Sequence, residues 1–222
     1  MRPFIAVFLL SWLVGALPTG AAPISDPLLA PGAPAWVRPR SRSAIEIEAF
    51  IRGEADGGRS QLLHLEGLRI EGPLDLSNCQ LDFGLVFENC VFGDAISLQD
   101  NRSPGVEFEH CTLARLNAHR VIVANNLALR HCRVSGAANL SAASVGGQLS
   151  LWRSTFEGKD APVSLDDIHV AGMLFLRGCE FAGPISLNWA RLDRNMDAND
   201  ARFLNSSVGA DLDAITAAGA LF

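Results

Sequence analysis

The chain has 222 residues, of which 24 are acidic and 18 are basic, so its formal net charge at pH 7 is −6. The charged residues are interspersed along the chain, and no basic stripe stands out. This distribution argues against binding to nucleic acid by phosphate neutralisation, which needs clustered Lys and Arg side chains.

Residues 1–22 have the pattern of a secretory signal peptide. Arg2 supplies a short positive region, residues 4–17 form an apolar stretch, and the small residues Gly20, Ala21 and Ala22 suit a signal peptidase. The apolar stretch is short for a transmembrane helix. We therefore expect an exported protein, periplasmic or extracellular, and the competing interpretation is an uncleaved membrane anchor.

Residues 23–42 contain five prolines and end in Arg38, Arg40 and Arg42. This composition predicts an extended linker, because proline favours extended backbone.

A short capping helix is predicted over residues 43–53. Ser43 and Glu46 form a capping box, and Gly53 supplies a stop. The predicted apolar face of this helix consists of Ile45, Ala49 and Phe50. We expect the helix to cover the open N-terminal end of the domain that follows, where unpaired strand edges would invite aggregation.

From about residue 65 the sequence repeats every eleven residues. Each repeat holds an apolar-x-apolar unit, such as Leu74-Asp75-Leu76, and a small-x-apolar unit, such as Cys79-Gln80-Leu81. The last apolar residues of successive units are five or six residues apart, a step that is too short for helices and fits one short strand and a corner. This regularity is typical of a solenoid, whose repeats bury their apolar faces against one another.

Four units add up to 22 residues, and apolar residues recur at that interval in four columns. The first two columns are Leu65, Phe87, Phe108, Leu129, Leu151, Leu176, Ala198, and Ile70, Phe92, Leu113, Val134, Phe156, Phe181, Phe203. The others are Leu76, Leu98, Ala118, Leu140, Leu165, Leu187, and Leu81, Ser103, Val123, Val145, Val170, Leu192. We expect all four columns to point into a coil of about six turns. A three-residue insertion near residues 157–162 is expected to bulge from one corner as a loop.

Glycine and asparagine mark the corners where the six-residue step lies. These positions are Gly72, Gly105, Gly136, Gly147, Gly158, Gly172 and Gly183, with Asn125 and Asn205. Because both residue types accept a positive φ, we expect sharp turns with left-handed backbone at these positions.

The repeat units resemble those of pentapeptide-repeat proteins, whose motif is a small residue, then Asp or Asn, then Leu or Phe, then two free positions. The units that match its buried positions are Cys79-Gln80-Leu81, Cys111-Thr112-Leu113, Ala190-Arg191-Leu192 and Ala201-Arg202-Phe203. The resemblance covers roughly residues 65–214. The chain departs from the family in its longer turn and in the rarity of Asp or Asn at the middle position.

Periodicity and resemblance together predict an all-β fold, a right-handed parallel four-sided β-helix over residues 54–214 with about 22 residues per turn. The resemblance implies an interaction surface, which is the role most associated with the family. Some of its members mimic DNA, but the predicted signal peptide of this chain counts against that role.

The five cysteines all occupy the small position of their units. Because other units place Ala or Ser there, we expect buried free thiols. Cys90, Cys111 and Cys132 should stack on consecutive turns about 4.8 Å apart. One axial disulfide among them would be strained at that spacing, and it stays an alternative. A zinc site lacks the usual ligand spacing.

Two groups of polar residues are weighed as sites. His110 and His131 should lie above one another and could share a metal, although a solvated pair is the simpler interpretation. An acidic stretch near the C-terminal end could form a catalytic or calcium-binding groove, and it contains Asp193, Asp197, Asp200, Asp211 and Asp213. No catalytic, cofactor-binding or metal-binding residue is predicted outright, and no cofactor is implied.

The leading hypothesis is an exported structural or interaction protein whose rigid β-helix binds another protein or itself, and is not an enzyme. The alternative is a carbohydrate-active or metal-dependent enzyme that uses the acidic C-terminal face. Residues 215–222 form an apolar tail without charge. We expect the tail either to fold over the last turn as a lid or to mediate a homodimer through the C-terminal end.

Overall fold

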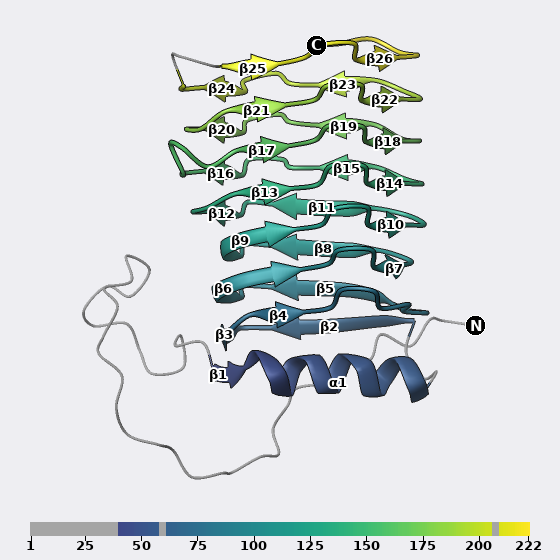
Figure 1. Cartoon of the computed structure of the whole chain (residues 1–222), viewed down its shortest axis with the longest axis vertical. Helices are drawn as coiled ribbons and strands as arrows, with labels where there is room; N and C mark the ends of the chain where they lie inside the picture. Colours follow the sequence, from purple (N-terminus) through teal and green to yellow (C-terminus); the bar gives the residue numbers. More distant parts are fainter. Residues whose placement is uncertain (1–39, 58–60, 206–208) are drawn as a thin grey trace.

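The computed structural model describes residues 40–57, 61–205 and 209–222. The predicted signal peptide over 1–22 and most of the predicted linker over 23–42 lie outside the described residues. The described chain is a parallel β-solenoid preceded by one helix (Figure 1). Its strands pair at intervals of about 22 residues, as Leu65 does with Phe87, so the predicted period is confirmed.

The solenoid has four faces, which we number I to IV in chain order. Face I is a seven-stranded parallel sheet, so it shows seven turns where the sequence predicts about six. Its strands are β2 (Leu62–Glu66), β5 (Gly84–Glu88), β8 (Val106–Glu109), β11 (Leu127–Arg130), β15 (Leu149–Ser150), β19 (Leu174–Phe175) and β23 (Met196–Asp197).

Faces II and III belong to one thirteen-stranded sheet. Face II holds β1 (Arg40–Ser43), β3 (Leu68–Glu71), β12 (Arg133–Val134), β16 (Thr155–Phe156), β20 (Glu180–Phe181) and β24 (Arg202–Phe203). Face III holds β4 (Leu74–Asp75), β13 (Ala138–Asn139), β17 (Val163–Ser164), β21 (Ile185–Ser186) and β25 (Ala210–Asp211). The two faces are joined because β6 (Val91–Ser97) and β9 (Thr112–Asn117) run through both of them.

Face IV is a six-stranded sheet. Its strands are β7 (Arg102–Ser103), β10 (Ile122–Val123), β14 (Ser144–Val145), β18 (His169–Val170), β22 (Arg191–Leu192) and β26 (Thr216–Ala217).

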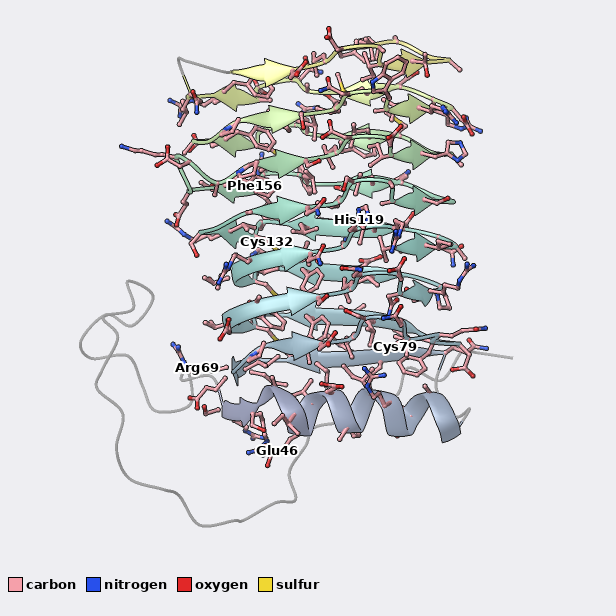
Figure 2. All side chains as sticks on the ribbon, viewed as in Figure 1. Glu46, Arg69, Cys79, His119, Cys132 and Phe156 are labelled. Atoms are coloured by element: carbon pink, nitrogen blue, oxygen red, sulfur yellow. The ribbon has the colours of Figure 1, made fainter. Side chains whose placement is uncertain are left out.

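The four predicted columns point into the interior. Every member is buried except Ala198, which is partly buried, and Phe203, which is 42% exposed on the last turn. Aromatic rings stack along the axis, with centroids 5.2 Å apart for Phe87 and Phe108 and 5.0 Å apart for Phe156 and Phe181. Figure 2 labels Phe156 among the side chains of the coil. The interior is therefore occupied by side chains that hold neighbouring turns together.

The helix α1 (Ala44–Gly57) lies across the N-terminal end of the coil (Figure 1). Its capping box is confirmed: the Glu46 amide donates to Ser43 Oγ and the Ser43 amide donates to Glu46 Oε2, both at 3.2 Å. The expected stop at Gly53 is wrong, because the helix continues for another turn to Gly57. Within the described residues, no helix has the length and apolar character needed to cross a membrane.

The apolar face predicted for this helix is only partly right: Phe50 packs against the core, whereas Ile45 is 77% exposed and Ala49 is exposed. The residues buried against the first turn are Ala44, Ile47 and Ile51. The physical reason is the helical period: positions i, i+3 and i+7 share one face, and the isoleucines at 47 and 51 outweigh the one at 45.

The last residues of the predicted linker are part of the solenoid. Arg40–Ser43 forms β1, which pairs in parallel with Leu68–Glu71 on face II. This strand satisfies the main-chain groups of β3, which would otherwise stand at an open sheet edge.

The positive φ predicted for the corner glycines holds only at Gly72 (φ 88°). Left-handed residues lie instead at the other two corners, directly before the small position of each unit. Between faces I and II they are Gly67, Asn89, His110, His131, Arg153, Gly178 and Asp200. Between faces III and IV they are Asn78, Asp100, Arg120, Ala142, Asp167, Trp189 and Ala214.

Glycine is needed at most of these corners because consecutive turns approach closely there. A Cβ added at Gly147 would lie 2.7 Å from the carbonyl oxygen of Asn125, one turn below. A Cβ at Gly136 would lie 2.6 Å from the carbonyl oxygen of Ala114. At these two corners glycine therefore removes a steric conflict between main chains and needs no left-handed conformation, whereas a Cβ at Gly105 would meet only an ordinary contact of 3.5 Å.

The apolar tail neither folds back as a lid nor leaves the coil. Thr216–Ala217 forms β26, which pairs with β22, and Leu221 forms a bridge with Met196 on face I. The tail therefore continues the solenoid through faces IV and I. The insertion near residues 157–162 is a loop at the corner after β16, as expected, and pairing resumes at Val163 with Ala138 (Figure 1).

Candidate binding face

The five cysteines are buried free thiols. Burial raises the pKa of the Cys179 thiol to about 12. A hydrogen bond with Cys132, together with burial, raises the pKa of the Cys111 thiol to about 12. Because the thiolate is the form that attacks electrophiles and binds metals, the thiols of Cys179 and Cys111 react slowly at neutral pH.

His110 and His131 stack as the register predicts, with ring centroids 4.8 Å apart. Trp152 follows in an edge-to-face arrangement with His131, the ring centroids 5.1 Å apart. Burial lowers the pKa of His131, and the positive charges of His110 and Arg153 lower it further. The other three described histidines lie apart: His64 contacts Glu88 on face I, His119 contacts Ser141 just after face III, and His169 contacts Asp193 at face IV.

The aspartates of the predicted acidic groove are dispersed around the coil. Asp193 follows β22 on face IV and pairs with His169 at 3.1 Å, whereas Asp197 lies in β23 on face I. Asp211 lies in β25 on face III and accepts a hydrogen bond from Asn188. Asp200 lies at a corner between faces I and II, and Asp213 follows β25. Among the described residues, no group of three or more His, Cys, Asp or Glu side chains could hold a metal ion.

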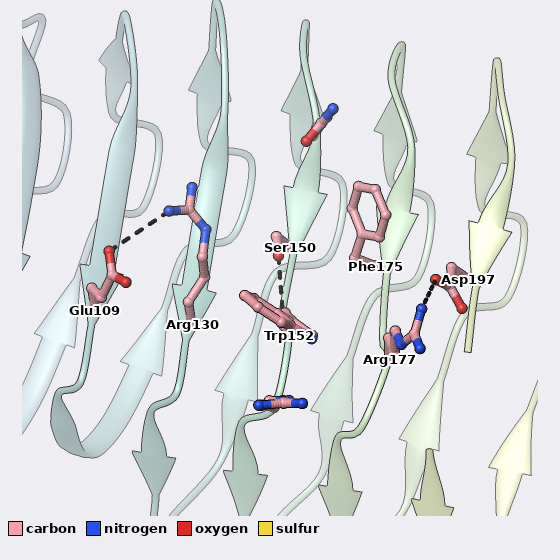
Figure 3. Close-up of a pocket in the computed structure, with 9 residues that line it drawn as sticks. Glu109, Arg130, Ser150, Trp152, Phe175, Arg177 and Asp197 are labelled. Carbon is pink, nitrogen blue, oxygen red and sulfur yellow. Dashed lines mark hydrogen bonds and ion pairs between the residues drawn. The ribbon is translucent and has the colours of Figure 1, made fainter. Parts of the chain in front are cut away.

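The structure instead shows a hollow of about 570 Å³ on the outer side of face I (Figure 3). It extends from β8 to β23 and is lined by Glu109, Arg130, Gln148, Ser150, Trp152, Arg153, Phe175, Arg177 and Asp197. We call it the Trp152 hollow. Strand alternation places these side chains outward, because their neighbours Leu149, Leu151 and Leu174 point into the core.

The centre of the Trp152 hollow is aromatic. Trp152 is 37% exposed, Phe175 is half-buried, and the small Ser150 lies between them and is buried (Figure 3). The Arg153 guanidinium stands 5.3 Å from the centroid of the Trp152 ring, a cation–π arrangement. The small side chain of Ser150 leaves the space that the two aromatic rings border.

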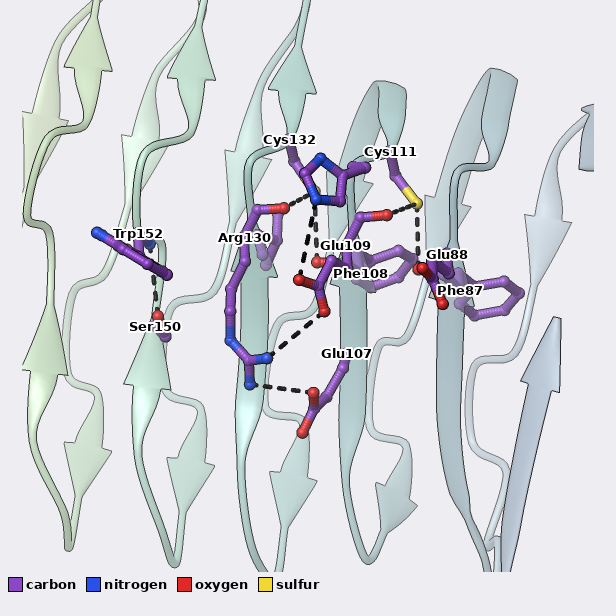
Figure 4. Close-up of polar contacts among 12 residues, drawn as sticks. Phe87, Glu88, Glu107, Phe108, Glu109, Cys111, Arg130, Cys132, Ser150 and Trp152 are labelled. Carbon is purple, nitrogen blue, oxygen red and sulfur yellow. Dashed lines mark hydrogen bonds and ion pairs between the residues drawn. The ribbon is translucent and has the colours of Figure 1, made fainter. Parts of the chain in front are cut away.

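Ion pairs border the hollow on both sides along the axis. On one side Arg130 contacts Glu107 at 3.0 Å and Glu109 at 3.7 Å (Figure 4). On the other side Arg177 approaches Asp197 at 3.9 Å. Arg153 has no carboxylate partner among the described residues. With Glu107 counted, three arginines face three carboxylates, and the uncompensated positive charge of the hollow is that of Arg153.

Apart from Asp197, the residues of the Trp152 hollow are not among the candidate site residues predicted from the sequence, although the sequence contains a signal for them. Trp152 lies one position after the inward Leu151, and Phe175 one position after the inward Leu174, so the register itself assigns both aromatic side chains to the surface. Large aromatic residues at two neighbouring outward positions are unusual for a solvated face. The dispersed aspartates, by contrast, were close only in sequence.

No family model matches this chain, and no curated protein matches it in sequence. The conclusion on architecture therefore rests on the periodicity and on the structure, which agree on a repeat β-helix.

Proposed function

We propose that the chain is an exported interaction protein, a divergent relative of pentapeptide-repeat proteins whose rigid solenoid binds another macromolecule through the Trp152 hollow. The single observation that carries this proposal is the exposed aromatic centre with three arginines around it. Trp and Arg are the residues most enriched among those that dominate binding energy at interfaces.

The rigidity of the scaffold supports the proposal. β11, β15 and β19 each pair with a strand on both sides, so the residues of the hollow stand on backbone that is fixed in register. Binding by fixed side chains avoids part of the entropic cost of ordering a surface. The left-handed corners repeat in the same way on every turn, which keeps the face regular.

The alternative, an enzyme on the acidic C-terminal face, needs carboxylates that converge on one groove. Asp193, Asp197 and Asp211 lie on three different faces, so the structure does not support the observation on which this alternative depends. The interaction hypothesis needs no such convergence.

The proposal is tested by capture from a cell-envelope fraction on the immobilised full chain. Trp152→Ala should lose the captured component, whether protein or glycan, and Arg153→Gln should reduce its amount. Trp189→Ala is the matched control, because Trp189 is 66% exposed at a corner between faces III and IV. Capture that is unaffected by Trp152→Ala, or lost equally in Trp189→Ala, would contradict the proposed function.

A further inference from the structure

We infer that the ligand of the Trp152 hollow is an anionic polysaccharide that carries uronic acid residues. The inference rests on the proposed function and names the chemical class of the partner.

The arginine without a carboxylate partner in the described part of the chain, Arg153, is the group of the hollow that calls for an anion, since Glu107, Glu109 and Asp197 accompany the other two arginines. Arg130 and Arg177 keep N–H groups beyond those facing Glu107, Glu109 and Asp197, since a guanidinium has five donors. Arg153 faces no carboxylate among the described residues and is held over the Trp152 ring. A ligand carboxylate would supply the missing partner of Arg153 through a charge-assisted hydrogen bond.

The aromatic centre calls for a ligand with one apolar face. A pyranose ring presents C–H groups on its flat side and hydroxyl groups around its rim. Trp152 and Phe175 offer apolar surface at the centre, while Gln148 and Asp197 place hydrogen-bonding groups at the edge. This division into an apolar platform and a polar rim matches a sugar ring better than it matches an inorganic anion.

The spacing of the solenoid suits a polymer that runs along its axis. Arg130, Trp152 and Arg177 occupy equivalent outward positions of consecutive turns, and adjacent turns are about 4.8 Å apart. One sugar unit of a polysaccharide is of similar length. Consecutive units would therefore meet Arg130, Trp152 and Arg177 in succession, because these residues stand at equivalent strand positions.

An acidic peptide fits less well. An extended peptide gains much of its affinity by pairing its main chain with an open strand edge. The strands beneath the hollow are central strands whose main-chain groups are already paired with the turns above and below. A peptide would have side-chain contacts alone.

The test is calorimetric titration of the full chain with three hexamers: galacturonate, the matching neutral galactose hexamer, and glutamate. We expect the galacturonate hexamer to bind most tightly. Trp152→Ala and Arg153→Gln should each weaken its binding about tenfold, as expected for the loss of a charge-assisted hydrogen bond or a stacking contact. Trp152→Phe should retain part of the affinity, and Trp189→Ala should retain all of it.

Equal binding of the neutral hexamer would overturn the requirement for charge, and equal binding of glutamate hexamer would assign the hollow to acidic peptides. Absence of galacturonate binding overturns the inference even if envelope capture still depends on Trp152, in which case the proposed function stands. If envelope capture did not depend on Trp152, the proposed function itself would be contradicted.

Discussion

The thiol of Cys111 donates a hydrogen bond of 3.2 Å to the main-chain carbonyl of Phe87, one turn below it (Figure 4). The same contact recurs in this column: Cys132 donates to Phe108, and Ser154 Oγ donates to Leu129 at 3.0 Å. At the opposite left-handed corner, Asn101 Nδ2 donates to the carbonyl of Leu76. A buried carbonyl that faces a corner is satisfied by a donor, so where Cys, Ser or Asn occupies this position its side chain supplies that hydrogen bond. Turns that place Ala at this position, as at Ala143 and Ala190, form no such bond.

Ser154 offers the sharpest test of this role. Its hydroxyl donates to the Leu129 carbonyl and accepts the Cys132 amide, each at 3.0 Å. Ser154→Ala leaves both groups unpaired and should lower the free energy of unfolding by about 1–3 kcal/mol. Ser154→Cys restores the donor found on neighbouring turns and should cost less. Urea denaturation measures both, and equal stability of the alanine variant and the natural protein would contradict the role.

Much of the fold could be predicted from the sequence because burial repeats in register. Phe87, Phe108 and the other column members have one environment on every turn, so a single pattern places them all. The small size of this position could be predicted from the sequence, but its hydrogen bonds could not. Ser154 and Asn101 share it with residues that cannot donate, such as Ala143, and the acceptor is a main-chain atom that no sequence pattern shows.

Phe156→Ala should lower the free energy of unfolding by about 3–5 kcal/mol, because the stacked turns cannot close the cavity that it leaves. Phe156 is buried, and its ring stacks on that of Phe181. Phe203→Ala is the control in the same column, since Phe203 is 42% exposed and should cost clearly less. Equal losses for the two variants in urea denaturation would count against the described interior.

Gly147→Ala should destabilise the protein by about 1–3 kcal/mol, the cost of forcing extra volume into a close contact. The reason is the carbonyl oxygen of Asn125, 2.7 Å from the added Cβ, and not a positive φ. Gly53→Ala provides the opposite case: nothing lies within 4 Å of its added Cβ, and Gly53 is inside α1. That variant should gain about 0.5–1 kcal/mol from helix propensity. Thermal unfolding measures both changes in stability. If both variants gained stability, or both lost it, the close contact described at Gly147 or the open position described at Gly53 would be wrong.

The buried thiols should resist alkylation in the folded protein. With the Cys179 pKa at about 12, roughly one molecule in 10⁴ carries the thiolate at pH 8. A folded pKa above the unfolded value of 9.0 also means that stability is fully present below pH 9 and is lost as the pH rises toward 12. Labelling by iodoacetamide at pH 8 should therefore be slow in buffer and complete at five sites in urea.

Lys159→Cys, on the exposed corner loop, is the reactive control for this labelling experiment. Mass spectrometry should find one fast label at residue 159 and none at the five natural cysteines. Rapid labelling of Cys179 in the folded protein would show that its column is open to solvent.

The Trp152 hollow could have been predicted only in part. The register places Trp152 and Phe175 outward, but their meaning depends on which residues stand beside them on other turns. His131 and Arg153 reach the Trp152 ring across a corner, and Arg177 comes from the following turn. Such neighbours are 20 or more residues apart or lie around a bend, so the pattern along the chain does not bring them together.

Self-association through the last described turn stays a prediction, and the structure changes how it is best tested. Apolar side chains are exposed there at Phe203, Leu204, Leu221 and Phe222. Removing residues after Asp213 would delete β26 and uncover β22, so a truncated chain would confuse stability with assembly. Point substitutions that keep the strand are the better choice.

The double variant Phe203→Ser and Phe222→Ser should shift the protein toward monomer, because it removes apolar surface that a second copy would cover. Ile45→Ser is the matched control, since Ile45 is 77% exposed on α1 at the other end of the coil. Sedimentation velocity over a range of concentrations measures both. A natural chain that stays monomeric throughout, or an equal shift with Ile45→Ser, would rule out assembly through this turn.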